Sequence, residues 1–176
     1  MSILKIARMG HPVLLARAEA VEDAAAPEIQ ALISAMAQTL ADAGGVGLAA
    51  PQVHVKLRLF LFHVPASRDE DGVAMPLRAV INPVVEPVEA AGIELGWEGC
   101  LSIPGLRAAV PRWRVIRLSG QDQTGEAFEE ELSGFAARVV QHEADHLDGV
   151  LYPMRMEDFR LFGYTEELDR YPQELL

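Results

Sequence analysis

The chain has 176 residues, half of them hydrophobic, and its formal net charge is −11. This length and composition fit one domain with a substantial core, so we expect residues 1–176 to form a single domain. The acidic charge argues against direct nucleic-acid binding, which would need a basic patch. No apolar run approaches the length of a membrane span. The only cysteine, Cys100, excludes an internal disulfide and suits the reducing cytoplasm, where we expect the protein to act.

Two helical segments are predicted near the start of the chain. Gly10–Leu14 is typical of a turn that enters a short helix, because proline is tolerated at a first helical position. Residues 27–43 have apolar side chains at helical spacing, which predicts an amphipathic helix that packs on the core. The apolar residues of that face are Ile29, Leu32, Ile33, Met36 and Leu40.

A glycine-rich segment, AGGVGLAAPQ, follows at residues 43–52. Glycine lets the backbone approach a ligand closely. The segment is not a phosphate-binding loop, because no Lys-Ser or Lys-Thr pair follows the glycines. It is therefore either a helix end with a turn, or a loop that lines a ligand site. In the second case, Gln52 could donate a hydrogen bond to an oxyanion.

Short apolar segments in the middle of the chain predict strands, and residues 57–64 have the pattern of a half-buried one. Glycine and proline separate these segments, and a charged loop is expected at residues 67–72. Closely spaced strands favour antiparallel pairing, because parallel neighbours need longer crossovers. The remaining predicted strands are 78–82, 84–89, 93–97, 106–110, 115–119 and 127–132.

The segment QHEADHLDG at residues 141–149 places two histidines four residues apart, with a glutamate after the first. In a helix, His142 and His146 would share one face, about 40° apart around the axis, and could bind one metal ion. Glu143 would lie about 100° further round and could reach a water in an open coordination position. This arrangement is typical of a metallohydrolase, in which the carboxylate transfers the proton of an acidified water. The alternative is an exposed helix that happens to carry histidines and acids.

The sequence before this motif favours a helix. We expect it to begin after Ser133 as the N-cap and to end at Gly149 as the C-cap. Its apolar face continues into the metal-binding face, which favours a rigid, partly dehydrated site. The residues that recur along this face are Phe135, Val139, His142 and His146.

A third metal ligand is available between two predicted strands, in the segment WEGCLSIP at residues 97–104. A Cys100 thiolate from this loop could join the two histidines and leave one tetrahedral position for water. A lone cysteine is more often a small buried apolar residue. The residues alone therefore leave this assignment open.

The chain resembles peptide deformylase at four separated places in the right order, and the last three match the family motifs residue by residue. A further similar stretch, residues 106–112, lies between them, so that the resemblance spans nearly the whole chain. The four places are Gly10–Leu14, Gly45–Gln52, Glu98–Ser102 and Gln141–Gly149.

The resemblance implies an enzyme that removes the formyl group from the N-terminal methionine of newly made polypeptides and releases formate. It also implies that Cys100, His142 and His146 bind a divalent metal ion and that Glu143 is the general acid/base. With the strand and helix pattern, it leads us to expect one catalytic domain of the α+β class. In this fold, antiparallel β-sheets pack around a central metal-binding helix.

The resemblance further implies that the side chain of Gln52 and the backbone N–H of Leu101 hold the oxyanion. Arg107 is predicted to meet peptide backbone or carboxylate, with a strand-surface arginine as the alternative. Asp145 is expected to be a solvated acid, with an ion pair to Arg112 as the alternative. The predicted lining of a pocket for the methionine side chain is Val46, Gly47, Gly99, Phe135 and Val139.

The family is associated with Fe²⁺ in cells, while Zn²⁺, Ni²⁺ or Co²⁺ can occupy the same ligands in purified protein. The expected partners are N-formylmethionyl nascent peptides, which are met near the ribosome. Residues Tyr164–Leu176 are acidic, so a ribosome contact through a basic tail is not supported. We expect neither direct nucleic-acid binding nor a membrane partner.

Two other functions are compatible with parts of the sequence. A metalloprotease could use the same His-Glu-x-x-His chemistry, although its usual downstream ligand or glycine pattern is missing. A catalytically silent metal-binding paralogue is the second alternative. The presence of Glu143, Gln52 and Cys100 argues against it.

Overall fold

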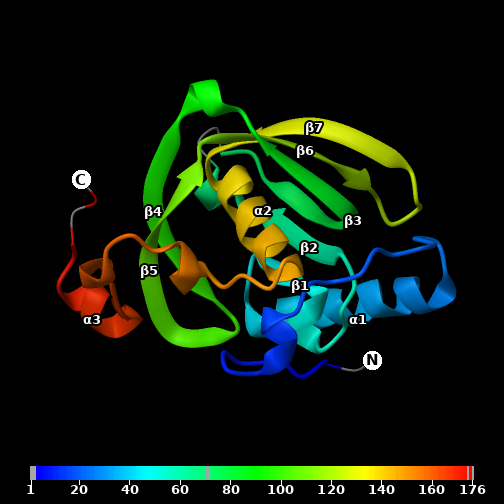
Figure 1. Ribbon diagram of the computed structural model, residues 1–176, viewed down its shortest axis with the longest axis horizontal. Coiled ribbons are helices and arrows are strands. Elements are labelled where there is room, and N and C mark those ends of the chain that lie inside the picture. Colours follow the sequence, from blue (N-terminus) through cyan, green and yellow to red (C-terminus); the bar gives the residue numbers. More distant parts are fainter. Residues whose placement is uncertain (1–2, 70–71, 174, 176) are drawn as a thin grey trace.

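Two antiparallel sheets and a helix between them form the centre of the structure, a computed structural model that describes residues 3–69, 72–173 and 175 (Figure 1). The five-stranded sheet has the order β1-β2-β3-β6-β7, and the three-stranded sheet has the order β4-β5-β8. The strands of the first sheet are β1 (Gly47–Ala49), β2 (Leu59–Val64), β3 (Met75–Pro87), β6 (Val115–Gln121) and β7 (Ala127–Ser133). Those of the second are β4 (Ile93–Cys100), β5 (Ile103–Trp113) and β8 (Phe162–Tyr164).

The α-helices of the described residues are α1 (Pro27–Ala43), α2 (Gly134–Leu147) and α3 (Thr165–Arg170). Helix α2 carries the two predicted histidine ligands and lies between the two sheets (Figure 1). The expected α+β class, with antiparallel sheets around this helix, is confirmed. No helix in the described part of the chain is long and apolar enough to cross a membrane.

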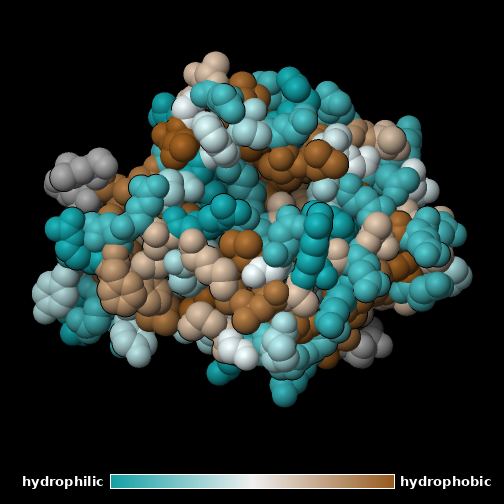
Figure 2. Space-filling model, in the orientation of Figure 1, coloured by the Kyte–Doolittle hydropathy of each residue, from teal (hydrophilic) through white to brown (hydrophobic). Residues whose placement is uncertain are grey.

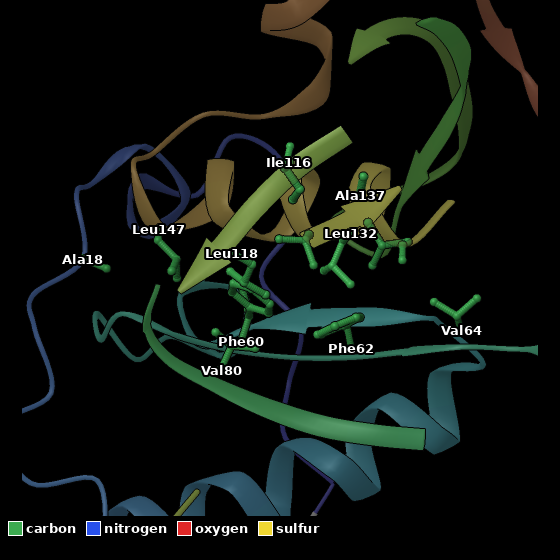
Figure 3. Close-up of a cluster of buried hydrophobic side chains, with 14 residues drawn as sticks. Ala18, Phe60, Phe62, Val64, Val80, Ile116, Leu118, Leu132, Ala137 and Leu147 are labelled. Atoms are coloured by element: carbon green, nitrogen blue, oxygen red, sulfur yellow. The ribbon is translucent and has the colours of Figure 1, made fainter. Parts of the chain in front are cut away.

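Strand β2 is buried on both faces, and the prediction of a half-buried strand was wrong. Successive side chains of a strand point to opposite faces. Leu59 and Leu61 pack in a cluster with residues of α1, whereas Phe60 and Phe62 pack with residues of α2 (Figure 3). A helix therefore covers each face of the five-stranded sheet, and this sheet gives α2 a rigid support.

Helix α1 has the predicted bounds, and it ends at Gly44 in a left-handed conformation with φ of +66°. The short helix predicted after Gly10 is also present, as a 3₁₀ turn at Pro12–Leu15. Part of the charged loop expected at 67–72 is described, but residues 70–71 lie outside the described residues. On the face shown in Figure 2, hydrophilic residues cover most of the surface between smaller hydrophobic patches.

The two strands predicted at 78–82 and 84–89 are one strand, β3, and their separation was wrong. Its pairing with β6 shifts between Ile81 and Val84, where Asn82 has a φ of +50°. The Asn82 side chain accepts a hydrogen bond from the Val21 N–H at 2.8 Å and donates one to the Val21 carbonyl at 2.9 Å. Pro83 therefore lies at a bulge that the side chain stabilises, rather than at a strand end.

Prolines also fail to interrupt β5, which runs through Pro104 and Pro111. The short strand β8 pairs only with Leu106–Ala108, so neither proline has to donate a hydrogen bond to it. Because β4 and β5 are longer than predicted, Cys100 is the last residue of β4 and not part of a loop. The thiol is therefore positioned by a strand.

Two details of α2 differ from the prediction. Ser133 is the N-cap residue, but its side chain makes no capping hydrogen bond. The C-cap is Asp148, and Gly149 is the residue after it, with φ of +73°. A Cβ atom at Gly149 would lie 2.6 Å from the carbonyl oxygen of Leu15, so this glycine lets the chain pass close to the N-terminal segment.

We predict that Gly149→Ala destabilises the fold more than Gly125→Ala. Both glycines have positive φ, but a Cβ at Gly125 would meet only Ala24 at 3.7 Å, an ordinary contact. Gly125→Ala should lower the free energy of unfolding by about 1–2 kcal/mol, the cost of a left-handed alanine. Gly149→Ala should lower the free energy of unfolding by at least about 1 kcal/mol more than this, because its Cβ would collide with the backbone of Leu15. Urea unfolding of the metal-free proteins measures both, and equal losses would contradict the argument.

Candidate metal centre

The structure brings together the three residues that the sequence suggested as metal ligands. One donor atom each from Cys100, His142 and His146 lies within 4.8 Å of the other two. The Cys100 Sγ is 3.3 Å from the Nε2 of His146. The two imidazoles are edge to face, with centroids 5.0 Å apart, as expected for residues four apart on one helix. A strand end and a helix turn thus meet at one point.

The donor set fits a divalent transition metal. One thiolate and two imidazoles suit Zn²⁺, Fe²⁺, Co²⁺ and Ni²⁺, and three protein ligands leave a coordination position open. The Nδ1 of His142 lies 2.9 Å from a carboxylate oxygen of Glu98. An ionised carboxylate only accepts hydrogen bonds, so this nitrogen carries the proton and the Nε2 lone pair faces the metal position.

Glu98, which sequence reasoning left out of the site, holds this histidine in place. Its side chain is 4% exposed and accepts hydrogen bonds from Arg112 (Nε at 2.8 Å, Nη2 at 3.0 Å) and from Arg138 (Nη1 at 2.9 Å). Burial raises the pKa of the Glu98 carboxyl, but hydrogen bonds from His142 and Arg112 outweigh this and lower it to about 2. The carboxylate is therefore ionised. Its position in the motif Glu98–Ser102 was the available signal.

The prediction of a solvated Asp145 was wrong, because this residue is 8% exposed and pairs with Arg155 at 2.7 Å. The alternative, an ion pair between Arg112 and Asp145, is present with an N–O distance of 2.6 Å. Burial lowers the pKa of Arg112, but Glu98 and Asp145 raise it above its usual value. A row of alternating charges therefore runs from Glu98 through Arg112 and Asp145 to the half-exposed Arg155, and each buried charge of this row has a partner.

Glu143 is buried beside the ligands, with 4% of its surface exposed. Its Oε2 has no hydrogen-bond partner among the described residues. Burial raises the pKa of the Glu143 carboxyl to about 7. A buried carboxylate oxygen without a partner, next to three metal donors, leaves an acceptor for a water or a substrate proton.

Gln52 is buried, and its orientation is determined by its neighbours. The Oε1 accepts a hydrogen bond from the Ala49 N–H at 2.8 Å, so the amide nitrogen points the other way. The Nε2 donates to the Ser102 hydroxyl at 3.1 Å and lies 3.5 Å from the Cys100 sulfur. A preoriented N–H donor thus faces the metal position.

A cavity of about 470 Å³ opens beside these groups. Both predicted oxyanion donors, Gln52 and Leu101, line it. Arg68, Trp97 and Arg138 also line it, and sequence reasoning missed them. Five of the six predicted substrate-pocket residues are in the lining, namely Val46, Gly47, Gly99, Phe135 and Val139.

The sixth, Arg107, is not among the lining residues. Its guanidinium pairs with Asp169 at 2.7 Å and lies 5.1 Å from the centre of the Trp97 ring. Asp169 belongs to α3, far along the chain. The acidic C-terminal segment therefore supplies the arginine with a partner that the motif alone did not reveal.

The sequence of the chain is similar to those of known proteins along most of its length. The sequence model of the polypeptide deformylase family matches residues 3–161. The chain belongs to the peptide deformylase family. It is 53% identical to peptide deformylase 2 of Bordetella bronchiseptica over 164 residues, with 93% of each chain covered. It is 47% identical to peptide deformylase 1 of Nitrosomonas europaea, with 94% of each covered.

Solved peptide deformylases have the same fold. The structure from Thermotoga maritima aligns with a TM-score of 0.79 and 37% identity, over 90% of this chain and all of that one. A class I type b enzyme from Acinetobacter baumannii, bound to Met-Ala-Ser, aligns with a TM-score of 0.80 and 34% identity, over 88% and 99%. This protein is thus a deformylase that removes the N-formyl group from nascent polypeptides, not a metalloprotease or a silent paralogue.

We predict that Gly47→Ala disables the deformylase without unfolding it. A Cβ at Gly47 would lie 2.2 Å from the Oε1 of Glu143, so the carboxylate must move. A displacement of about 1 Å at a reacting group can cost about 10²-fold in rate. Formate release and bound metal should be measured together, and metal content should be unchanged. Gly163→Ala is the control, since its Cβ would meet only Leu168 at 3.5 Å. Unchanged turnover in Gly47→Ala would contradict the argument.

Proposed function

We propose that residues 1–176 act as one catalytic domain in which Cys100, His142 and His146 hold a single divalent metal ion. The observation that carries the proposal is the meeting of three donor atoms within 4.8 Å beside the unpartnered carboxylate oxygen of Glu143. The chemistry that the ion supplies is Lewis acidity, which polarises the formyl carbonyl and acidifies an attacking water. The remaining steps belong to side chains of this chain.

Glu143 is proposed as the general acid/base. Its unpartnered oxygen can accept the proton of the attacking water. The protonated carboxyl then delivers that proton to the departing amine, which would otherwise be a poor leaving group. The close packing of Gly47 against this side chain supports the role, because it restricts the positions that the carboxylate can adopt.

Gln52 and Leu101 are proposed to stabilise the formyl oxygen as it gains negative charge. The Gln52 amide is held on one side by Ala49 and on the other by Ser102, so it does not have to reorganise during the reaction. The backbone N–H of Leu101 is proposed as the second donor. Loss of one such donor typically costs about 2.7–4 kcal/mol of transition-state stabilisation.

The cavity beside the donors is proposed to receive the methionine side chain of an N-formylmethionyl peptide. Val46, Phe135 and Val139 give it apolar walls, and Gly47 and Gly99 leave room for an unbranched thioether. The Met-Ala-Ser peptide held by the Acinetobacter baumannii enzyme supports this class of ligand. Arg107 stays a prediction as a contact for peptide backbone or carboxylate, and in that role it would exchange Asp169 for the substrate.

We propose Fe²⁺ as the ion in cells and Zn²⁺, Ni²⁺ or Co²⁺ as replacements in purified protein. All four accept thiolate and imidazole donors, and Fe²⁺ is the weakest binder of the four at a given site. We also propose that the enzyme acts in the cytoplasm near the ribosome, where its nascent-chain substrates are made. The described part of the acidic C-terminal segment includes α3, whose Leu168 is buried, so this helix is part of the fold rather than a free arm.

We predict that Glu143→Ala retains metal and loses most turnover. The three ligands are untouched, whereas removal of a general acid/base typically lowers the rate by about 10²–10⁴-fold. Formate release from a formyl-methionyl peptide and metal content should be measured on the same sample. The matched control is Glu166→Ala, an exposed position on α3. A metal-loaded Glu143→Ala protein with normal activity would overturn the assigned role.

The proposed iron centre leads to a separate prediction about oxygen. Thiolate ligands oxidise readily, and iron lost in air is replaced by tighter-binding ions. Protein purified without oxygen should contain more iron and have a higher specific activity than an aerobic preparation. Metal removal with a chelator should abolish activity, and added Fe²⁺ should restore it under anaerobic conditions. Equal activity of aerobic and anaerobic preparations would speak against iron.

A further inference from the structure

Arg138 connects helix α2 to the strand that carries the cysteine ligand. It lies one helical turn before His142, and its side chain is only 13% exposed. The Nη1 donates to the carbonyl oxygens of Gly96 at 3.3 Å and Val110 at 2.8 Å, and the Nη2 donates to that of Glu94 at 2.8 Å. These carbonyls belong to β4 and β5, so one guanidinium binds the backbone of both strands.

Gly96 makes this contact possible. A Cβ atom there would lie 2.7 Å from both the Cζ and the Nη2 of Arg138. The guanidinium therefore packs directly on the backbone of β4, where any other residue would push it away. Arg138 also donates to the Glu98 carboxylate, but Glu98 has two further bonds from Arg112 and one from His142. Arg112 also binds Glu98, so the contribution that Arg138 makes alone is its hydrogen bonds to the backbone carbonyls of β4 and β5.

The ligands of the proposed metal ion come from a strand and a helix, and no sheet hydrogen bonds join these two elements. Cys100 ends β4, which is an edge strand paired only with β5, whereas both histidines are on α2. Metal–ligand distances tolerate errors of about 0.2 Å, so the strand and the helix must be held in a fixed relative position. Arg138 is placed to do this, because it is four residues before His142 on α2 and binds Gly96, which is four residues before Cys100 on β4.

We propose that Arg138 is a positioning residue that fixes β4, and with it the Cys100 sulfur, relative to the two histidines of α2. The proposal rests on the metal site proposed above. Arginine suits the task because its planar group offers several donors in fixed directions, which lysine cannot reproduce. Loss of Arg138 leaves Glu98 paired with Arg112 and His142, so the change exposes no uncompensated buried charge.

Arg138→Met is the first test, with Co²⁺ as the bound metal because its thiolate and ligand-field absorption reports coordination geometry. We expect a shifted Co²⁺ spectrum and loss of the ion to a chelator at least about tenfold faster than from the unaltered protein. Arg138→Lys should give an intermediate result, since one donor group replaces the fork. Arg117→Met is the matched control, because this arginine is half exposed on β6 with only long ion pairs of 3.6 and 3.9 Å.

Gly96→Ala tests the same contact from the other side and keeps the arginine. It should displace the guanidinium, shift the Co²⁺ spectrum in the same direction and accelerate metal loss. The double variant Arg138→Met/Gly96→Ala should be no worse than the more severe single variant, because both changes remove one contact. Gly163→Ala, whose Cβ would make only ordinary contacts with Leu168, is the glycine control.

The outcomes separate this proposal from the proposed metal site. If the unaltered protein shows no thiolate absorption with Co²⁺, or if Cys100→Ala does not abolish that absorption, the metal site itself fails. If the unaltered protein binds Co²⁺ through Cys100 but folded Arg138→Lys, Arg138→Met and Gly96→Ala all keep its spectrum and chelation rate, the positioning role is overturned. Additive effects in the double variant would also contradict it. Should Arg138→Met not fold, the other two single variants decide.

Discussion

The candidate metal centre depends on a buried carboxylate, that of Glu98. It faces His142, one of the proposed metal ligands, and is held from the other side by Arg112, while Arg138 binds one of its oxygens. Because the carboxylate is ionised and hydrogen-bonded on both oxygens, it selects the tautomer of His142 that leaves Nε2 free. A hydrogen bond to the second nitrogen fixes the orientation of a histidine ligand, so the arginines act on the candidate metal site indirectly, through Glu98 and His142.

Helix α2 serves two surfaces at once. One side packs on Phe60 and Phe62 of the five-stranded sheet (Figure 3), and on another side His142 and His146 lie beside Glu98 and Cys100 of the three-stranded sheet. A rigid packed face on one side is what allows chemistry on the other, because ligand positions are then set by the core. Gly47 provides space for the buried carboxylate of Glu143, because the backbone can lie close to this group only where there is no side chain.

Local patterns in the sequence were enough to predict much of the fold. The bounds of α1, the helix that carries the histidines, the antiparallel sheets and the α+β class follow from periodicity, spacing and turn residues, which act over a few positions. The motif chemistry of His142, Glu143 and His146 is also local. The residues alone left the roles of Cys100 and Gln52 open, and the family resemblance favoured them; the structure brings both side chains beside these groups.

Other features were decided only by contacts between distant segments. The bulge at Asn82 keeps β3 continuous because its side chain binds Val21, sixty-one positions away in sequence, a partner that no local pattern reveals. Asp145 became buried because Arg112 and Arg155 pair with it across the fold. The sequence by itself therefore identified the groups proposed for the chemistry and the helix that carries three of them. Tertiary structure decided which charges compensate one another, because pairing energies in a buried site depend on distances that sequence separation does not encode.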